Sequence, residues 1–515
     1  MRFSWKNWLP WIAAAFGGVL FGLGYPDQRL WLPAWFCFLP LLWALRNVQT
    51  WKRALALSWT MGLGAHLYVY PWLVHMLREF GHLPLPLAVL GYLLLCLAQS
   101  GSIAVAGFGA WALARRTPFS LGAALPLALV GAEMLYPLLF PSYLANTQAG
   151  LPYVTQIADL GGTVMVSALV ALVNGGLYEL FFARRVRLAA VGGAALVATI
   201  VYSHVRIGQV EALEASSPKL KTAIVQANVG AGDKHLRAEE GIRKHRRMTD
   251  EAMRIPGIEL VVWPESGLNR AVPPTVKNLE GVVARKVQAP MIVGAVRVEF
   301  GERRRAWNTA LALAPGGDIV GVYDKIELLA FGEYVPLGEL FPSIYDMLPY
   351  SSHFQRGQST APLPVGDYRL STNICYEDIL PALVRKLMGP IDAAGTRPHA
   401  LVNLTNDSWY GPMEPPIHLA LATFRSIEHR RWMIRSTSTG ISAFIDASGR
   451  VVKRSGFETE EILVHDVPMI TGGPTIYGRI GDAFGWMCTA AAAALLAFGP
   501  RLRRRERAEE NRAAA

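Results

Sequence analysis

The stretch YRLSTNICYED, residues 368–378, decides the fold of the soluble part of this chain. It begins as a strand, because apolar and β-branched residues dominate up to Ile374, and it then turns abruptly polar. Cys375 stands at that turn, directly before a tyrosine and two acids. Strands with polar side chains at their carboxyl ends are typical of α/β domains, in which ligands bind beyond those ends. We therefore expect an α/β domain around this stretch.

Two other stretches repeat the arrangement. The predicted strand 258–266 runs into Glu265, and the predicted hairpin 308–325, which turns at 315–317, ends in Lys325. The remaining predicted elements are strands at 220–229, 289–298 and 399–411, helices at 237–254, 276–287 and 419–436, and a hairpin at 440–455. Strands that alternate with helices in this way predict a layered α/β domain.

The rest of the chain is more apolar. Of its 515 residues 52% are hydrophobic, and many gather in long apolar runs, whereas a helix needs roughly 20 apolar residues to cross a bilayer. We predict eight membrane-spanning helices, at residues 9–25, 31–45, 54–76, 83–114, 119–140, 160–182, 188–205 and 482–498. The predicted organisation is a multi-pass helical membrane domain at 1–205, an α/β domain at 219–470, an eighth spanning helix at 480–499 and a basic tail at 500–515.

The lysines and arginines behind the net charge of +11 indicate how these spans are oriented in the membrane. Lysines and arginines gather at the N-terminus, in alternate loops and in the tail, and short cytoplasmic loops are enriched in such residues. Both termini are therefore predicted to be cytoplasmic. Seven spans precede residue 206, which places the α/β domain on the opposite side, the periplasm of a bacterial inner membrane. No basic stretch is interleaved with aromatic residues, so we predict no nucleic-acid partner.

The four cysteines separate into two groups. Cys37, Cys96 and Cys488 lie inside apolar runs, where cysteine behaves as a small apolar residue. Cys375 is alone in the α/β domain. A buried structural cysteine is the ordinary explanation, but a lone thiol in an oxidising compartment is a liability unless it has a function.

Nucleophilic catalysis would be such a function for Cys375. A cysteine attacks as thiolate, so it needs a base, and the oxyanion that it creates needs donors. Glu265, Lys325 and Cys375 supply a base, a cation and a nucleophile, and the backbone amide of Tyr376 is a further donor. The histidines of the domain lack the spacing of metal ligands, so we predict no metal, and we predict no cofactor; these histidines are His353, His399, His418 and His429.

Other polar residues have simpler explanations. Asp378 follows the cysteine where a helix is expected to begin, and charging the first turn of that helix is its predicted role. The arginines at 303–305 are either lipid headgroup contacts or a solvated loop, and we favour the loop. Trp409 and Tyr410 belong to a loop after a strand, where packing near the site is the first expectation.

Three ordered motifs resemble a known superfamily. They are VVWPES (261–266), YDKIELLAFGEYVPLG (323–338) and NICYED (373–378). They resemble the motifs of the nitrilase, or carbon–nitrogen hydrolase, superfamily, and the resemblance implies an αββα sandwich with a catalytic triad of Glu265, Lys325 and Cys375. FGEYVP and CYED within them, with several spans before the domain and one after it, are more similar to the apolipoprotein N-acyltransferase family.

That resemblance implies an activity. Such enzymes take an acyl chain from a phospholipid, typically phosphatidylethanolamine, and pass it to the amino group of a diacylglyceryl-cysteine apolipoprotein, the final step of bacterial lipoprotein maturation. It also implies that Glu333 is a second acid and that Tyr376 and Glu377 support the nucleophile. His235 stands where the family often has a substrate-contacting tryptophan, and Trp409 is a second possible substrate contact.

Two other functions remain open at this point. A membrane-anchored amidase or nitrilase would use the same triad with water as the acceptor, although eight spans exceed what an anchor needs. A transporter would need more ionisable residues in its spans, where Glu133, Glu179, His66 and His75 are the main ones. An acyl donor held in the bilayer explains the spans best.

Overall fold

The computed structural model describes residues 5–230, 238–301, 305–330, 332–335, 341 and 353–514. The chain divides into two compact units. The first comprises residues 1–75, 83–207 and 479–515, and the second comprises residues 76–82 and 208–478. The predicted domain boundaries at 205, 219 and 470 remain predictions.

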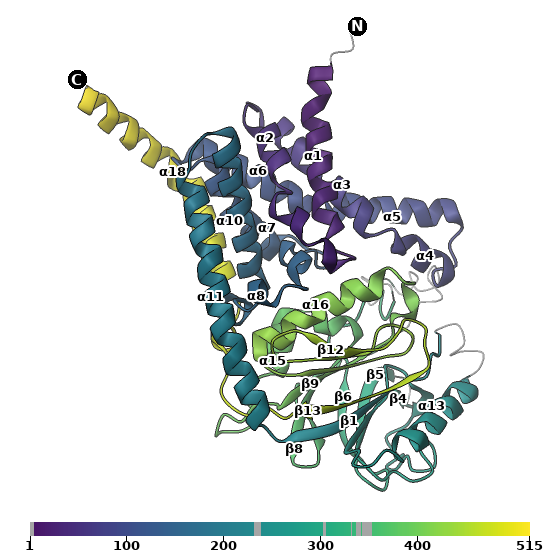
Figure 1. The fold of residues 1–515 in the computed structure, drawn as a ribbon. Helices are drawn as coiled ribbons and strands as arrows, with labels where there is room; N and C mark the ends of the chain where they lie inside the picture. The colour runs from purple at the N-terminus through teal and green to yellow at the C-terminus, as the bar shows by residue number, and fades with distance from the viewer. Residues whose placement is uncertain are drawn as a thin grey trace. The chain divides into compact units, whose positions relative to one another are not determined.

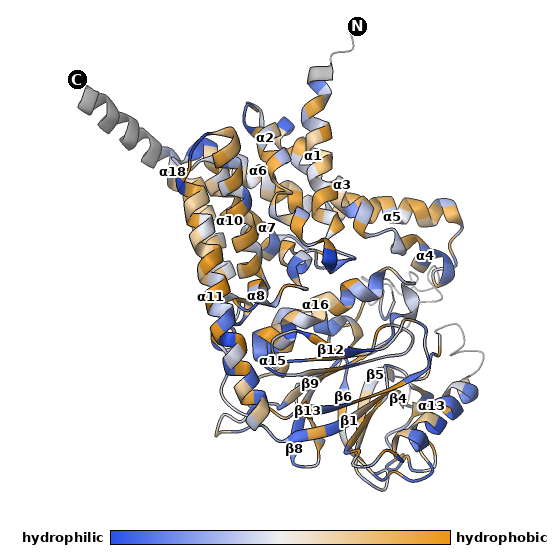
Figure 2. Ribbon diagram, in the orientation of Figure 1, coloured by the Kyte–Doolittle hydropathy of each residue, from blue (hydrophilic) through white to orange (hydrophobic). Residues whose placement is uncertain are grey.

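The first unit is helical (Figure 1). Its longer helices are α1 (Trp5–Leu23), α2 (Leu39–Leu45), α3 (Trp51–Val69), α5 (Leu85–Gln99), α6 (Gly101–Arg116), α7 (Leu121–Leu135), α10 (Thr163–Phe182), most of α11 (Arg187–Ser216), and α18 (Ala483–Ala514). The short helices α8 (Pro152–Thr155) and α9 (Ala158–Gly161) precede α10, and α4 (Trp72–Glu79) leads out of this unit. Figure 2 shows the apolar character of α5, α10 and α11.

Four stretches of the described chain are long and apolar enough to cross a membrane, which indicates a membrane protein. They are Leu85–Arg116, Thr163–Phe182, Arg187–Ser216 and Ala483–Pro500. The helices Asn7–Leu23 and Leu121–Leu135 are apolar but shorter. The predicted total of eight spans remains a prediction.

Two of the predicted spanning helices differ in the structure. Residues 31–45 form a 3-10 turn at Leu32–Trp35 and the seven-residue helix α2, because Pro33 and Pro40 are disfavoured in a helix interior and stand instead in the first turn of these two elements. The run 83–114, predicted as one helix, is interrupted at Ser100 between α5 and α6. The next residue is Gly101, where a Cβ would stand 2.0 Å from the Tyr136 hydroxyl, so Tyr136 packs against the break.

The second unit holds two β-sheets stacked face to face, with helices on their outer faces (Figure 1). The first sheet has the strand order β13-β1-β2-β4-β5-β6, with β3 paired to β4. Its strands are β1 (Lys219–Gln226), β2 (Leu260–Val262), β3 (Leu268–Val272), β4 (Met291–Glu299), β5 (Arg305–Leu313), β6 (Ile319–Asp324) and β13 (Glu461–Pro468). The second sheet has the order β12-β11-β10-β9-β8-β7. Its strands are β7 (Leu363–Val365), β8 (Tyr368–Ile374), β9 (Ala400–Thr405), β10 (Met433–Thr437), β11 (Ala443–Ile445) and β12 (Val451–Arg454).

Three apolar clusters hold these layers together. The largest lies between the sheets and includes Ile224, Val262, Val402 and Phe444. The second lies between the first sheet and α13 (Ala238–Ala252), and the third between the second sheet and the helices α15 (Pro381–Leu387) and α16 (Glu414–His429). The layers are therefore helix, sheet, sheet and helix, which confirms the predicted αββα sandwich.

Two predicted helices of this domain are wrong in part. Residues 276–287 form turns, because Asn278 donates a side-chain hydrogen bond to the carbonyl of Gly316 and the backbone pairs with the β5–β6 turn instead of with itself. The predicted helix 419–436 ends at His429, where Arg430 adopts a left-handed conformation with φ of 50°, and the chain continues as β10.

Candidate active site

Cys375 leaves the end of β8 in a strained conformation. Its φ of +53° lies in the left-handed region, which costs a residue with a side chain roughly 1–2 kcal/mol. Two contacts hold it there. The carboxylate of Glu377 accepts a hydrogen bond from the amide of Ile374 at 2.8 Å, and Asn403 donates to the Cys375 carbonyl at 3.2 Å. The thiol is buried and is not part of a disulfide.

Lys325 lies between two acids. Its Nζ is 2.7 Å from Glu333 Oε2 and 3.7 Å from Glu265 Oε1, and its side chain is 1% exposed. Asn308 of β5 donates to both acids through Nδ2, at 2.6 Å to Glu265 and 2.8 Å to Glu333. The arrangement places one cation and one amide between two carboxylates. It joins the ends of β2 and β6 to the turn that carries Glu333.

A glycine makes room for this cluster. Glu265 follows β2 in a turn that passes very close to β4, and a Cβ on Gly294 of β4 would stand 2.2 Å from the carbonyl oxygen of Pro264. A side chain at position 294 would therefore displace the turn that positions Glu265. Asn308 and Gly294 are positions that the sequence analysis did not identify, because each has a role only once β4 is paired with β2 on one side and with β5 on the other.

The electrostatics connect Cys375 to this cluster. Burial and Glu265 raise the pKa of the Cys375 thiol, whereas Lys325 lowers it. Burial opposes the charge on Lys325, but Glu333, Glu265 and Cys375 outweigh it and raise the pKa of that ammonium. Lys325 is therefore a permanent cation that favours the thiolate, and the nearby carboxylate of Glu265 is placed to accept the thiol proton.

Glu377 connects the nucleophile to the lysine. It is fully buried, and its two oxygens accept hydrogen bonds from the Tyr323 hydroxyl and from the amides of Ile326, Glu327 and Ile374, at 2.7–2.9 Å. Burial raises the pKa of Glu377 to about 7, although Lys325 and these donors lower it. Ile326 follows Lys325 and Ile374 precedes Cys375, so one side chain fixes both functional residues.

The other predicted site residues have different surroundings. Tyr376 is partly buried, and burial raises the pKa of its hydroxyl to about 12. Trp409 is 38% exposed, and its ring centroid lies 4.5 Å from that of Phe80, which belongs to the same unit. His235 and the arginines at 303 and 304 lie outside the described residues.

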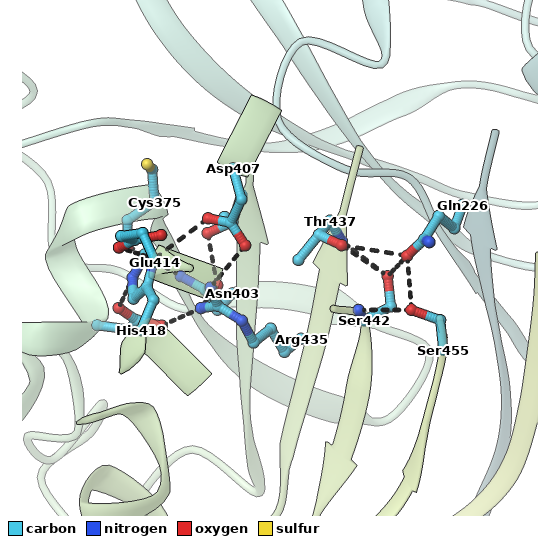
Figure 3. Close-up of polar contacts among 12 residues, drawn as sticks. Gln226, Cys375, Asn403, Asp407, Glu414, His418, Arg435, Thr437, Ser442 and Ser455 are labelled. Carbon is cyan, nitrogen blue, oxygen red and sulfur yellow. Dashed lines mark hydrogen bonds and ion pairs between the residues drawn. The ribbon is translucent and has the colours of Figure 1, made fainter. Parts of the chain in front are cut away.

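A buried ion network underlies the cysteine turn (Figure 3). His418 of α16 faces Asp378 at 2.7 Å and Asp407 at 3.2 Å, and Arg435 of β10 contacts the same two acids. Asp378, Asp407 and Arg435 are completely buried. The prediction that Asp378 only charges the first turn of a helix is therefore wrong, because its carboxylate holds an arginine and a histidine inside the protein.

This network also contains the one group of possible metal ligands found among the described residues. Asp407, Glu414 and His418 each place a ligand atom within 4.8 Å of the others. Burial and Arg435 oppose protonation of His418, but Asp378 and Asp407 outweigh them and raise its pKa to about 10. A protonated imidazole has no lone pair for a metal. The group is better described as an ion-pair network, and the absence of a metal remains a prediction.

A second polar cluster joins the two sheets (Figure 3). Gln226, at the end of β1, accepts hydrogen bonds through Oε1 from Thr437, Ser442 and Ser455 at 2.6–3.1 Å. Its Nε2 donates to the carbonyls of residues 456 and 459. Strand β1 belongs to one sheet and β10 to the other, so Gln226 holds the two sheets together beside the site.

Two family models match this chain. Residues 221–477 match the carbon–nitrogen hydrolase family, which defines the class of the second unit. Residues 17–176 match the N-terminal domain of apolipoprotein N-acyltransferase. Among solved structures, Saccharomyces cerevisiae Nit3, a member of branch 10 of the nitrilase superfamily, is 17% identical, with a TM-score of 0.36 over 49% of this chain and 90% of its own.

Two curated relatives extend over nearly the whole chain. The apolipoprotein N-acyltransferase of Geobacter metallireducens is 31% identical over 515 residues, covering 95% of each chain. That of Bdellovibrio bacteriovorus is 30% identical over 479 residues, covering 87% of this chain and 86% of its own. The chain belongs to the apolipoprotein N-acyltransferase family.

Proposed function

We propose that this protein transfers an acyl chain from a phospholipid to the N-terminal amine of a diacylglyceryl-cysteine apolipoprotein through a thioester on Cys375. The observation that carries the proposal is the buried Lys325, held between Glu265 and Glu333 and in electrostatic contact with Cys375. A base, a cation and a thiol in one buried site are the groups that acyl transfer needs.

The first step forms the thioester. Glu265 accepts the thiol proton, and the Cys375 thiolate attacks the ester carbonyl of the donor. Negative charge then develops on the carbonyl oxygen, where the Lys325 ammonium and the backbone amide of Tyr376 are the proposed donors. The ester C–O bond breaks, the lysophospholipid alkoxide takes the proton from Glu265, and lysophospholipid leaves.

The second step forms the amide. The acceptor amine attacks the thioester carbonyl and loses a proton to Glu265, and the Cys375 thiolate is the leaving group. Glu265 then gives this proton to the thiolate, which restores the thiol and the carboxylate. Glu333 keeps Lys325 in place in both steps, because its carboxylate is the nearer partner of the ammonium. Glu377 holds the cysteine turn. Tyr376 supports the nucleophile beside Glu377, and Trp409 and His235 are proposed to contact the substrates.

The apolar helices support a donor that stays in the bilayer. Four stretches are suited to cross it, and acyl chains can remain in lipid while the ester group enters the site. We place both termini in the cytoplasm and the second unit in the periplasm of the inner membrane, as the loop charges predict. Phosphatidylethanolamine is the proposed donor. The chemistry uses no metal, cofactor or nucleic acid.

The test is to follow thioester, lysophospholipid, free fatty acid and acylated peptide together. Purified protein mixed with phosphatidylethanolamine alone should release one burst of lysophospholipid and accumulate a thioester on Cys375, measured by intact mass. A diacylglyceryl-cysteine peptide added afterwards should discharge the thioester and gain one acyl chain. Cys375→Ala is the control and should give neither product.

The hydrolase alternative predicts a different result. With water as the acceptor, free fatty acid would be released steadily without any peptide, at a rate that the peptide does not change. That outcome, or a normal burst from Cys375→Ala, would overturn the proposed function.

A further inference from the structure

A polar row crosses the second sheet directly beneath the cysteine turn. Asn373 of β8, Asn403 of β9 and Arg435 of β10 are register partners on three adjacent strands. All three are completely buried. Three large polar side chains buried side by side on adjacent strands need mutual hydrogen bonds to be tolerated, and their presence calls for a function.

Asn403 is the centre of this row. Its Oδ1 accepts hydrogen bonds from Arg435 Nη1 and Thr405 Oγ1, both at 2.8 Å. Its Nδ2 donates to Asn373 Oδ1 at 2.7 Å and to the Cys375 carbonyl at 3.2 Å. Every hydrogen-bonding position of the amide is therefore used, which fixes its orientation. The Cys375 carbonyl is the one backbone group in this set.

The ion network fixes Arg435 in turn. Its guanidinium contacts Asp378, which lies three residues after the cysteine, and Asp407, at 2.5 and 3.2 Å. His418 bridges the same two acids from α16. Burial raises the pKa of Glu414, the third acid of this network, to about 8, so Glu414 is neutral at pH 7. The two remaining acids, Asp378 and Asp407, then balance the two cations, Arg435 and His418. In Figure 3 the sulfur of Cys375 points away from Asn403 and Arg435.

We propose that Asn403 is a positioning residue for acyl transfer: anchored by Arg435, its amide holds the Cys375 carbonyl and so fixes the left-handed turn that aims the thiolate. The inference rests on the proposed function, because it assumes that Cys375 is the nucleophile. The turn needs such support, since a residue with a side chain leaves the left-handed region unless its surroundings hold it there. A shift of about 1 Å in a reacting atom lowers a rate by roughly 100-fold.

The sequence offers a matched pair of variants. Asn403→Asp keeps the acceptor for Arg435 and replaces by an oxygen the donor that serves both the Cys375 carbonyl and Asn373. Asn373→Asp is the control, because it makes the same chemical change in the same row. It keeps the Oδ1 that accepts from Asn403. It loses no hydrogen bond, because Asn373 Nδ2 has no hydrogen-bond partner among the described residues. Asn403→Ala removes the donor without adding charge, and it serves if Asn403→Asp does not fold.

The experiment uses the full-length protein in detergent with Cys37, Cys96 and Cys488 replaced by alanine. The measured quantities are the maximal rate of thioester formation on Cys375 and the phosphatidylethanolamine concentration that gives half of it. We expect the Asn403 variants to lose at least about 10-fold in maximal rate, while the half-saturating concentration stays within about 2-fold. Asn373→Asp should stay within about 3-fold in both quantities.

Three results separate the possibilities. If the folded Asn403 variants keep the maximal rate of the unsubstituted protein, the positioning role is refuted. If both asparagine positions lose rate equally, the row has only a structural role and the inference is likewise overturned. If the unsubstituted protein forms no thioester on Cys375, it is the proposed function that fails.

Discussion

Replacing Glu377 by glutamine tests how the nucleophile and the lysine are held together. One carboxylate oxygen accepts from the amides of Ile326 and Glu327, and the other accepts from the Tyr323 hydroxyl and the Ile374 amide. The glutamine amide group fits best beside Tyr323, whose hydroxyl can turn and accept. Only the Ile374 amide then loses its acceptor.

The expected loss of stability comes from the Ile374 amide, which is left without an acceptor. A buried donor without a partner costs about 1–3 kcal/mol. A neutral glutamine accepts weaker hydrogen bonds than a carboxylate does, which lowers the stability of the variant. This loss is offset, because glutamine avoids the cost of burying a carboxylate. The same cost raises the pKa of Glu377 to about 7. For a unit of this size, 1–3 kcal/mol corresponds to a fall in Tm of about 2–12 °C.

The effect on catalysis should exceed the effect on stability. Glu377 bonds the residue before Cys375 and the residue after Lys325, so a loosened contact shifts both functional groups. We expect the maximal rate of thioester formation to fall about 10–100-fold. The assays are thermal unfolding in detergent and intact-mass detection of the thioester, both below the lowered Tm.

Glu299→Gln is the control for this substitution. Glu299 lies on the first sheet and bonds two arginines near the surface, away from Cys375, so its loss should change stability by no more than about 0.5 kcal/mol. If Glu377→Gln forms the thioester as fast as Glu299→Gln does, the reasoning about Glu377 is refuted.

Three further predictions concern the cation, pH and topology. Lys325→Met should slow thioester formation by about 10²–10³-fold, or about 2.7–4 kcal/mol, and an unchanged intact-mass time course would remove Lys325 from the mechanism. Burial raises the pKa of Glu414 to about 8, so its proton stabilises the fold fully below about pH 4.5 and this contribution is lost as the pH rises through 8. Glu414→Gln should flatten the fall of Tm between these pH values, and a slope equal to that of the natural protein would contradict the assignment. Lys453→Cys, at an exposed position of the second unit, should react with a membrane-impermeant thiol reagent in cells whose outer membrane alone is opened, and labelling only after the inner membrane is opened would reverse the topology.

Local patterns in the sequence were sufficient for much of the fold. Residues 368–378 indicated a strand with a polar end, and the structure has β8 followed by the cysteine turn. Pro315 and its glycines indicated the β5–β6 turn, which is confirmed. These features depend on neighbours in the chain, so a pattern of adjacent residues is enough to predict them. The same holds for the three motifs that pointed to the family.

Local patterns failed where distant contacts decided the conformation. Residues 276–287 have a helical pattern, but bonds to the β5–β6 turn hold them as turns. Residues 419–436 continue the pattern of α16, yet the chain leaves the helix at Arg430, and its next residues complete the second sheet between β9 and β11. In both places tertiary hydrogen bonds outweigh a helix propensity of a few tenths of a kcal/mol per residue.

The same distinction applies to the site. The sequence was sufficient to predict Glu265, Lys325 and Cys375, because each follows its own strand. A polar residue after an apolar strand can be recognised from the sequence alone. Asp378, Asn403, His418 and Arg435 were not predicted as one network, because they come from a turn, two strands and a helix. Their polar character in apolar strands was visible, but their partners were not. Burial makes such groups depend on one another, and only the tertiary structure brings together the charges that must balance.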